Sequence, residues 1–256
     1  MLKVRVIPTL LWKDLGLVKG IGFDSWRRVG TVLPAIKVYN ARDVDELIVV
    51  DITATREKRA PQHETVADFS SYCFVPLTVG GGITEVEQIA HLLRAGADKI
   101  SLNSAAFADP EVVTAAARRF GAQCVVVSID VRRREDGTLA CLSHSGTVET
   151  GRSPVEWARE MADRGAGEIL LTSVDRDGTM EGYDLETIAA VCAAVPIPVI
   201  ASGGAGTYDH MIEAVRAGAS AVAAASMFHF TESTPAEAKK ALDAAGIAVR
   251  RNYTAS

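Results

Sequence analysis

The sequence lacks the features that identify secreted and membrane proteins. Its four cysteines are scattered, with no C-x-x-C pair, which favours reduced thiols over a disulfide framework. The longest apolar runs have the length of a strand, such as 47–50, so we expect no transmembrane helix. The N-terminus starts directly on a strand pattern, without a charged and then apolar signal segment. These absences predict a cytoplasmic protein with no membrane partner.

Several catalytic and binding signatures are also missing. No Walker motif, G-x-S-x-G motif or Cys–His dyad occurs, and the five histidines lack the spacing of metal ligands, so we expect neither a metal nor a cofactor. The net charge of −5 argues against nucleic acid as a main partner. What is present is a chain of 256 residues with 48% hydrophobic residues, which is enough for a large core.

The chain contains an internal repeat. Residues 76–107 read as strand, glycine turn, helix, strand and small polar turn, and residues 198–229 repeat this pattern 122 positions later. Eight of the 32 aligned positions are identical, among them two glycines, an Arg-Ala-Gly-Ala turn and a serine. Two copies of such a unit predict a doubled half-barrel, with halves of about 1–121 and 122–256 within a single domain 1–256.

Eight short β-branched runs alternate with helical patterns. The runs are 4–10, 47–52, 75–79, 99–103, 124–130, 168–173, 198–202 and 220–225, and the helical patterns include 85–95, 110–120, 153–164, 185–194 and 208–217. This alternation indicates a parallel sheet covered on both faces. Eight units with a two-fold repeat predict an α/β fold of the (β/α)8 TIM barrel type. The alternative is a doubly wound open sheet, into which the repeat fits poorly.

Two long connections interrupt the alternation. Residues 12–31, which contain four glycines, follow the first strand. Residues 131–152 follow the fifth strand and predict a hairpin around Glu135-Asp-Gly137. Because the active sites of such barrels lie at the C-terminal ends of the strands, both connections are candidate lids.

Small residues follow the strands at corresponding positions of the two halves. Glycine lets the backbone approach a phosphate closely, and the N-terminus of the following helix directs N–H groups at it. A glycine pair can also be no more than a tight turn, but its repetition favours a ligand with a phosphate at each end. The predicted binding residues are Gly81, Gly82, Asn103 and Ser104 in the first half, and Ser202, Gly203, Gly204, Ala225 and Ser226 in the second.

Carboxylates lie at or shortly after the ends of three predicted strands. Asp130 ends the fifth strand and is the candidate general acid or base, the alternative being a cap for the following loop. Asp51 and Asp177, the latter followed by Gly178, either bind substrate hydroxyls or order their own turns. Lys19, in the first lid, either closes on a phosphate or is solvated.

Four charged residues stand where strands begin, at the opposite mouth of the predicted barrel. They are Arg5, Glu46, Lys99 and Glu168. The residues alone favour a solvated rim over a ring across the barrel bottom, because buried ion networks are costly.

Several motifs closely resemble the cyclase subunit of imidazole glycerol phosphate synthase. They lie at 51–54, 78–82, 96–101, 165–173, 175–179, 201–206 and 225–230, within a match of about residues 4–252. The resemblance implies a barrel that uses ammonia from a glutaminase subunit docked at its N-terminal face. It also implies a phosphorylated, ribonucleotide-derived small-molecule substrate with two phosphates, and two catalytic aspartates.

The resemblance assigns further roles to individual residues. It implies that ammonia enters through a charged ring matched by Arg5, Glu46, Lys99 and Glu168, which reverses the preference for a solvated rim. It adds Ser145 and Thr172 to the substrate-binding residues and Asp98 to the partner interface.

Position 11 departs from the family pattern. Leu11 stands where the family carries a catalytic aspartate, and the internal repeat, with a three-residue shift at the first strand, independently pairs Leu11 with Asp130. Leucine cannot transfer a proton, and losing such a group costs about 10²–10⁴-fold in rate. Thr9 also replaces the usual cysteine, and the start of the chain resembles a divergent branch associated with amidation of sugars.

Three hypotheses follow from these observations. The leading one is a synthase subunit of a glutamine-dependent complex that works in a specialised pathway, with Asp130 as the remaining acid or base. The second is a genuine cyclase of histidine biosynthesis that tolerates Leu11. The third, of another class, is a non-catalytic scaffold that activates the glutaminase and passes on its ammonia.

Overall fold

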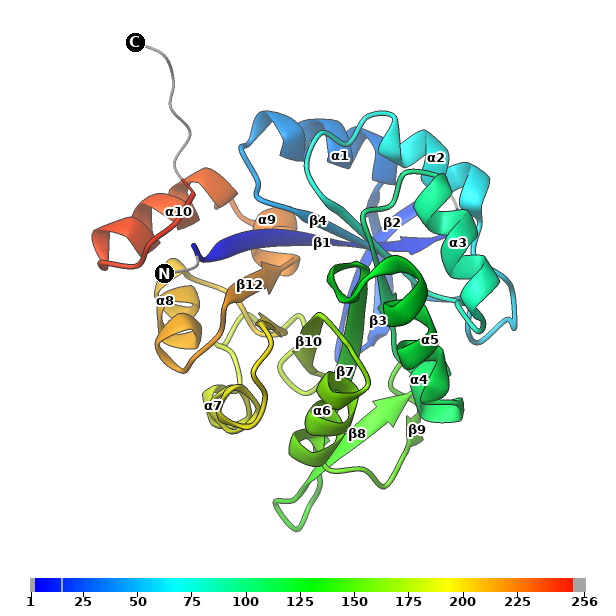
Figure 1. Cartoon of the computed structure of the whole chain (residues 1–256). Coiled ribbons are helices and arrows are strands. Elements are labelled where there is room, and N and C mark those ends of the chain that lie inside the picture. Colours follow the sequence, from blue (N-terminus) through cyan, green and yellow to red (C-terminus); the bar gives the residue numbers. More distant parts are fainter. Residues whose placement is uncertain (1–2, 15, 251–256) are drawn as a thin grey trace.

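Eight parallel strands close into a barrel in the computed structural model, which describes residues 3–14 and 16–250 (Figure 1). In order around the barrel they are β1 (Arg5–Lys13), β4 (Leu47–Asp51), β5 (Leu77–Gly80), β6 (Lys99–Leu102), β7 (Val125–Arg133), β10 (Glu168–Ser173), β11 (Val199–Ser202) and β12 (Ala221–Ala224). The circle closes where β12 pairs with β1, with Arg5 opposite Ala221. The predicted TIM barrel is confirmed, and the open-sheet alternative is wrong.

Helices surround the barrel on its outside (Figure 1). They are α1 (Val32–Ala41), α2 (His63–Ser70), α3 (Val86–Arg94), α4 (Ser104–Ala108), α5 (Glu111–Phe120), α6 (Pro154–Asp163), α7 (Leu185–Ala194), α8 (Tyr208–Arg216), α9 (Ser226–Phe230) and α10 (Pro235–Ala244), with a 3-10 turn at Ala122–Cys124. The five helical patterns named from the sequence are all present, with their ends within about one residue of the prediction. In the parts of the chain that the structure describes, no helix has the length and apolar character that a membrane span requires.

The interior of the barrel is filled with side chains. Ile7, Ile48, Val126, Leu170 and Ile200 are buried together there, with small contributions from the alanines of β12. The outward-facing residues of the same strands belong to a second, larger cluster beneath the helices. Burial on both faces explains why the strands read as continuous apolar runs. The interior cluster separates the mouth at the N-terminal ends of the strands from the mouth at their C-terminal ends.

Both long connections form antiparallel hairpins at the C-terminal mouth. The first connection forms β2 (Gly16–Ile21) and β3 (Asp24–Gly30), a hairpin that the glycines of this segment alone did not predict. The second continues β7 and turns back into β8 (Leu139–Ser143), with the short β9 (Val148–Glu149) beside it. The predicted turn is confirmed, because the Arg134 N–H donates to the Thr138 carbonyl and the Gly137 N–H to the Arg134 carbonyl.

Candidate active site

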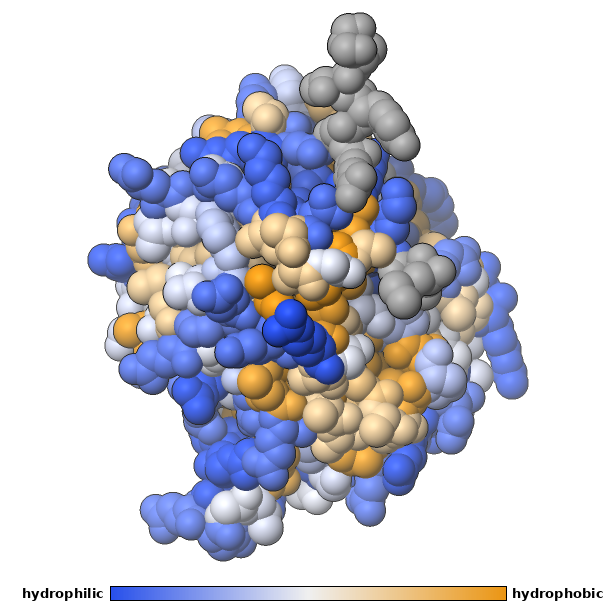
Figure 2. All heavy atoms as spheres, turned by 90° about the vertical axis from the view of Figure 1, so that its left-hand side faces the viewer, coloured by the Kyte–Doolittle hydropathy of each residue, from blue (hydrophilic) through white to orange (hydrophobic). Residues whose placement is uncertain are grey.

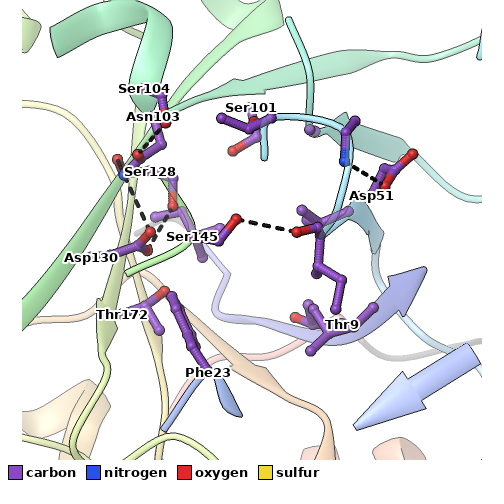
Figure 3. Close-up of a pocket in the computed structure, with 18 of the residues that line it drawn as sticks. Thr9, Phe23, Asp51, Ser101, Asn103, Ser104, Ser128, Asp130, Ser145 and Thr172 are labelled. Atoms are coloured by element: carbon purple, nitrogen blue, oxygen red, sulfur yellow. Dashed lines mark hydrogen bonds between the residues drawn. The ribbon is translucent and has the colours of Figure 1, made fainter. Parts of the chain in front are cut away.

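A cavity of about 540 Å³ opens at the C-terminal mouth of the barrel. All residues predicted to bind substrate or phosphate line it, together with Leu11 and Asp130. Figure 3 shows Asp130 and Thr172 on one side of this cavity, with Asp51 and Thr9 on the other. The barrel thus brings together side chains from both halves of the chain. The assigned residues are Lys19, Asp51, Gly81, Gly82, Asn103, Ser104, Ser145, Thr172, Asp177, Gly178, Ser202, Gly203, Gly204, Ala225 and Ser226.

Asp130 lies in a polar wall made by β6, β7 and β10. Its carboxylate accepts hydrogen bonds from the Asn103 side-chain amide at 3.2 Å and from the Ser128 hydroxyl at 3.2 Å (Figure 3). Burial raises the pKa of Asp130 to about 7, a shift that Ser128 opposes and the nearby charge of Asp177 reinforces. A carboxyl with a pKa close to neutral can both accept and donate a proton, which suits a general acid or base.

The side of the cavity away from Asp130 includes apolar residues of β1 and β4. Leu11 lies on β1, on the far side of the barrel from β7, and pairs in register with Val50 of β4. Both residues line the cavity, as does Thr9, whose hydroxyl is buried without a hydrogen-bond partner. Among the described β1 residues that line the cavity, Thr9 and Leu11, neither carries an ionisable side chain, so β1 offers no counterpart to the Asp130 carboxyl.

Asp51 is occupied by protein contacts. Its Oδ1 accepts hydrogen bonds from the backbone N–H groups of Thr53 and Ala54, and its Oδ2 lies 2.9 Å from the Arg59 guanidinium. Of the two roles considered for Asp51, the ordering of its own turn is the one that these contacts fulfil. Arg59 was missed because a single arginine in a loop carries no sequence signal.

Lys19 connects the first hairpin to the rim of the cavity. Its side chain is 1% exposed, and its Nζ lies 2.6 Å from Asp177 Oδ2. The Gly22 N–H donates to the Asp177 carbonyl at 2.9 Å, and Gly178 lies so close to the Gly20 carbonyl that a Cβ would overlap it. Of the two alternatives for Lys19, the solvated side chain is wrong, and the hairpin is held against the loop that follows β10.

The segment after β8 spans the same mouth. The His144 N–H donates to the Ser104 hydroxyl at 2.9 Å, and the Ser145 hydroxyl donates to the Ile52 carbonyl at 3.2 Å (Figure 3). Gly146 lies against the Phe23 ring at the tip of the first hairpin. The two candidate lids therefore meet above the cavity, although the sequence pointed to neither Phe23 nor His144.

The paired glycine turns have the same unusual backbone in both halves. Gly81 and Gly82 have φ of 101° and 72°, and Gly203 and Gly204 have φ of 88° and 110°. A Cβ on Gly81 would lie 2.1 Å from the Asp51 carbonyl oxygen, so only glycine fits there. Beside the second turn, the Ser226 hydroxyl is buried without a partner and lines the cavity. It remains available to a ligand.

The charged residues at the N-terminal mouth form a closed network. Arg5 lies 2.6 Å from Glu46 and 3.0 Å from Glu168, and Lys99 lies 3.1 Å from Glu46 and 2.9 Å from Glu168. All four side chains are 8–21% exposed. Burial lowers the pKa of Arg5, but the two glutamates outweigh this and raise it. The solvated rim that the residues alone favoured is wrong, and the four side chains form a ring.

Asp98 stands outside this ring. Its side chain accepts a hydrogen bond from the Leu77 N–H at 2.8 Å, and the residue is exposed at the same mouth. Within the described ranges 3–14 and 16–250, no group of three or more His, Cys, Asp or Glu residues could hold a metal ion.

Comparisons with known proteins agree with this geometry. A family model described as "Histidine biosynthesis protein" matches residues 5–234. Three similar proteins are each named "Imidazole glycerol phosphate synthase subunit HisF". The relative from Hyphomonas neptunium is 53% identical over 251 residues, which cover 98% of this chain and 99% of the relative. The relative from Caulobacter vibrioides is 49% identical over 252 residues, covering 98% and 97%. The relative from Gluconacetobacter diazotrophicus is 48% identical over 250 residues, covering 98% and 97%.

These matches confirm the resemblance that the motifs indicated. The names of the relatives support the histidine-pathway alternative better than the specialised pathway that position 11 favoured.

Proposed function

Because this chain belongs to the histidine biosynthesis protein family, we propose that it is the cyclase subunit of a glutamine-dependent synthase. It uses ammonia on a phosphorylated substrate, in the reaction for which its relatives are named. The observation that carries this proposal is Asp130, a carboxyl of near-neutral pKa in a cavity whose rim carries two glycine turns.

Asp130 is the proposed general acid and base. At neutral pH both of its protonation states are populated, so it can take a proton from the attacking nitrogen and return one to the leaving group. Asn103 and Ser128 fix its orientation through hydrogen bonds. Leu11 cannot transfer a proton, so Asp130 must both accept and donate protons, and the rate is expected to be low for the family.

The two glycine turns are the proposed sites for the two phosphate groups of the substrate. Gly82 and Gly204 line the cavity, so their backbone can contact phosphate oxygens closely. Ser226 contributes a hydroxyl that has no protein partner. The hairpin held by Lys19 and Asp177 excludes water from the cavity while the substrate is bound.

A glutaminase subunit is the proposed partner, docked at the N-terminal mouth around the ring. Figure 2 views the side of the molecule on which β1 begins, and apolar surface gathers in the middle of this face. Phe74, three residues before β5, is 83% exposed. Apolar surface of this kind is typical of subunit interfaces. Ammonia would pass the ring formed by Arg5, Glu46, Lys99 and Glu168 and cross the barrel interior to the cavity.

The direct test supplies the ribonucleotide-derived bisphosphate with ammonium salt at alkaline pH, where free ammonia is abundant. We expect the isolated barrel to form the cyclised product without a glutaminase. A folded protein that binds the substrate but forms no product under these conditions would refute the proposal.

A specialised pathway is the second candidate, because Leu11 replaces a carboxylate in the cavity. Expression in a histidine-requiring strain that lacks its cyclase subunit separates the two. Growth with the wild-type chain favours the histidine pathway. Growth only with Leu11→Asp favours a specialised pathway, in which the wild-type chain adds ammonia to a different acceptor and needs only one carboxyl for that reaction.

The non-catalytic scaffold makes a different prediction. If the barrel only delivers ammonia, Asp130→Asn leaves product formation by the whole complex unchanged, while Lys99→Met reduces it. Catalysis in this barrel predicts that both variants reduce it.

A further inference from the structure

The C-terminal segment of the chain lies beside the ring at the N-terminal mouth. α10 lies next to the beginning of β1 (Figure 1), and the residues after it run along this strand, where Val4 and Val249 form a parallel bridge. The Val4 N–H donates to the Ala248 carbonyl at 2.8 Å. The residue directly before Arg5 is therefore fixed by the C-terminal segment.

The residue directly after Arg5 is fixed from the same segment through a buried ion pair. The Val6 N–H donates to Asp45 Oδ2 at 2.9 Å. The other oxygen of Asp45 lies 3.5 Å from Lys239 Nζ of α10, which also binds Asp43 at 2.8 Å. Lys239 is 5% exposed and Asp45 is 4% exposed, so solvent screens this contact little.

Asp45 precedes Glu46, so the same contact holds two members of the ring. Arg5 and Glu46 form the shortest ion pair of the ring, at 2.6 Å. Their relative position depends on the backbone of β1 at Val6 and on the turn before β4 at Asp45. The Asp45 N–H donates to the Val6 carbonyl at 3.4 Å, the Asp45 carboxylate accepts from the Val6 N–H, and Lys239 lies against this carboxylate.

From this arrangement we propose that Lys239 is a positioning residue for the ring. By holding Asp45 against the Val6 N–H, it sets the Arg5–Glu46 pair and thereby the width of the N-terminal mouth. Its significance for ammonia transfer rests on the proposed function, whereas its effect on ring geometry does not. Lys240, the next residue of α10, is exposed and provides a matched control.

The first measurement is the side-chain Nε–Hε NMR signal of Arg5, assigned with an Arg5→Lys variant. Lys239→Met should shift or broaden this signal, and Lys240→Met should leave it unchanged. Lys239→Arg, which keeps the positive charge, should give a signal closer to that of wild type than Lys239→Met does. If Lys239→Met fails to fold, Asp45→Asn serves instead. The asparagine side chain carries no charge that would be buried without a partner, and its oxygen can still accept the hydrogen bond from the Val6 N–H. An unchanged Arg5 signal in the folded variant would overturn the proposal, whether or not the protein is a cyclase.

The second measurement is the ratio of glutamine-driven to ammonium-driven turnover in the complex. We expect Lys239→Met to lower this ratio by about fivefold while ammonium-driven turnover stays within about twofold of wild type. A parallel loss of both activities would mean general destabilisation and would contradict a positioning role. If the wild-type chain shows no ammonium-driven turnover, the proposed function fails, and the Arg5 signal still decides the role of Lys239.

Discussion

Leu11 and Asp130 line one cavity from strands on opposite sides of the barrel. One presents an apolar side chain and the other a carboxyl with a pKa of about 7. The two strands are equivalent in the internal repeat of the sequence, so the two halves share their glycine turns and differ in their chemistry.

The first prediction concerns this difference. Leu11→Asp adds a second carboxyl opposite Asp130, and we expect it to raise ammonium-driven turnover of the bisphosphate by about 10²-fold. Leu11→Asn, which is polar but transfers no proton, is the control and should leave the rate near that of wild type. Steady-state kinetics with ammonium salt measures both. Equal rates for the Asp and Asn variants would show that position 11 takes no part in proton transfer.

The second prediction concerns stability and pH. The pKa of Asp130 is raised in the folded protein, so the folded state holds this proton more tightly than the unfolded chain. The contribution of Asp130 to the free energy of unfolding is therefore most favourable below about pH 4 and is lost as the pH rises to about 7. Asp130→Asn removes the titrating group. We expect the variant to be more stable than wild type at pH 8, by about 1–3 kcal/mol, and to lose this advantage towards pH 4. Urea unfolding at both pH values measures it. A stability advantage of equal size at both pH values would contradict the conclusion that burial of the ionised Asp130 carboxylate destabilises the fold.

The third prediction concerns the first hairpin. Lys19→Met leaves Asp177 without its partner, and breaking a buried pair costs about 3–5 kcal/mol. The cost should appear as opening of the hairpin, with faster trypsin cleavage at Arg28 and a higher KM for the bisphosphate. Lys13→Met, at an exposed position of β1, is the control. Unchanged cleavage kinetics in Lys19→Met would mean that the ion pair does not hold the hairpin.

The fourth prediction concerns the first glycine turn. Gly81 combines a positive φ with a backbone contact that a Cβ would violate, so Gly81→Ala should destabilise the fold by about 1–3 kcal/mol or more. Gly30→Ala places its methyl group in open space and should stay within about 0.5 kcal/mol of wild type. Thermal unfolding of the two variants compares them. Similar melting temperatures would remove the structural requirement for glycine at 81.

The barrel and the cavity at its C-terminal mouth could be predicted because they depend on local patterns. Strand runs, helical periodicity and the repeat determine which residues lie at the C-terminal ends of the strands, and so placed Asp130 and the glycine turns correctly. The ring could not be decided from the residues alone, since Arg5 and Glu168 lie far apart in the chain and only closure of the barrel brings them within 3.0 Å. Arg59 and Phe23 were missed for a related reason: their loops fold over the cavity through contacts that leave no periodic signal.

The measurement that tests the central claim most directly is ammonium-driven turnover of the bisphosphate by the wild-type chain and Asp130→Asn. If Asp130 is the acid and base of an ammonia-using cyclase, the wild type forms product and the variant loses at least about 10²-fold in kcat, with little change in KM. Equal turnover by the two proteins would contradict the account, because the reaction would then proceed without the carboxyl on which it depends.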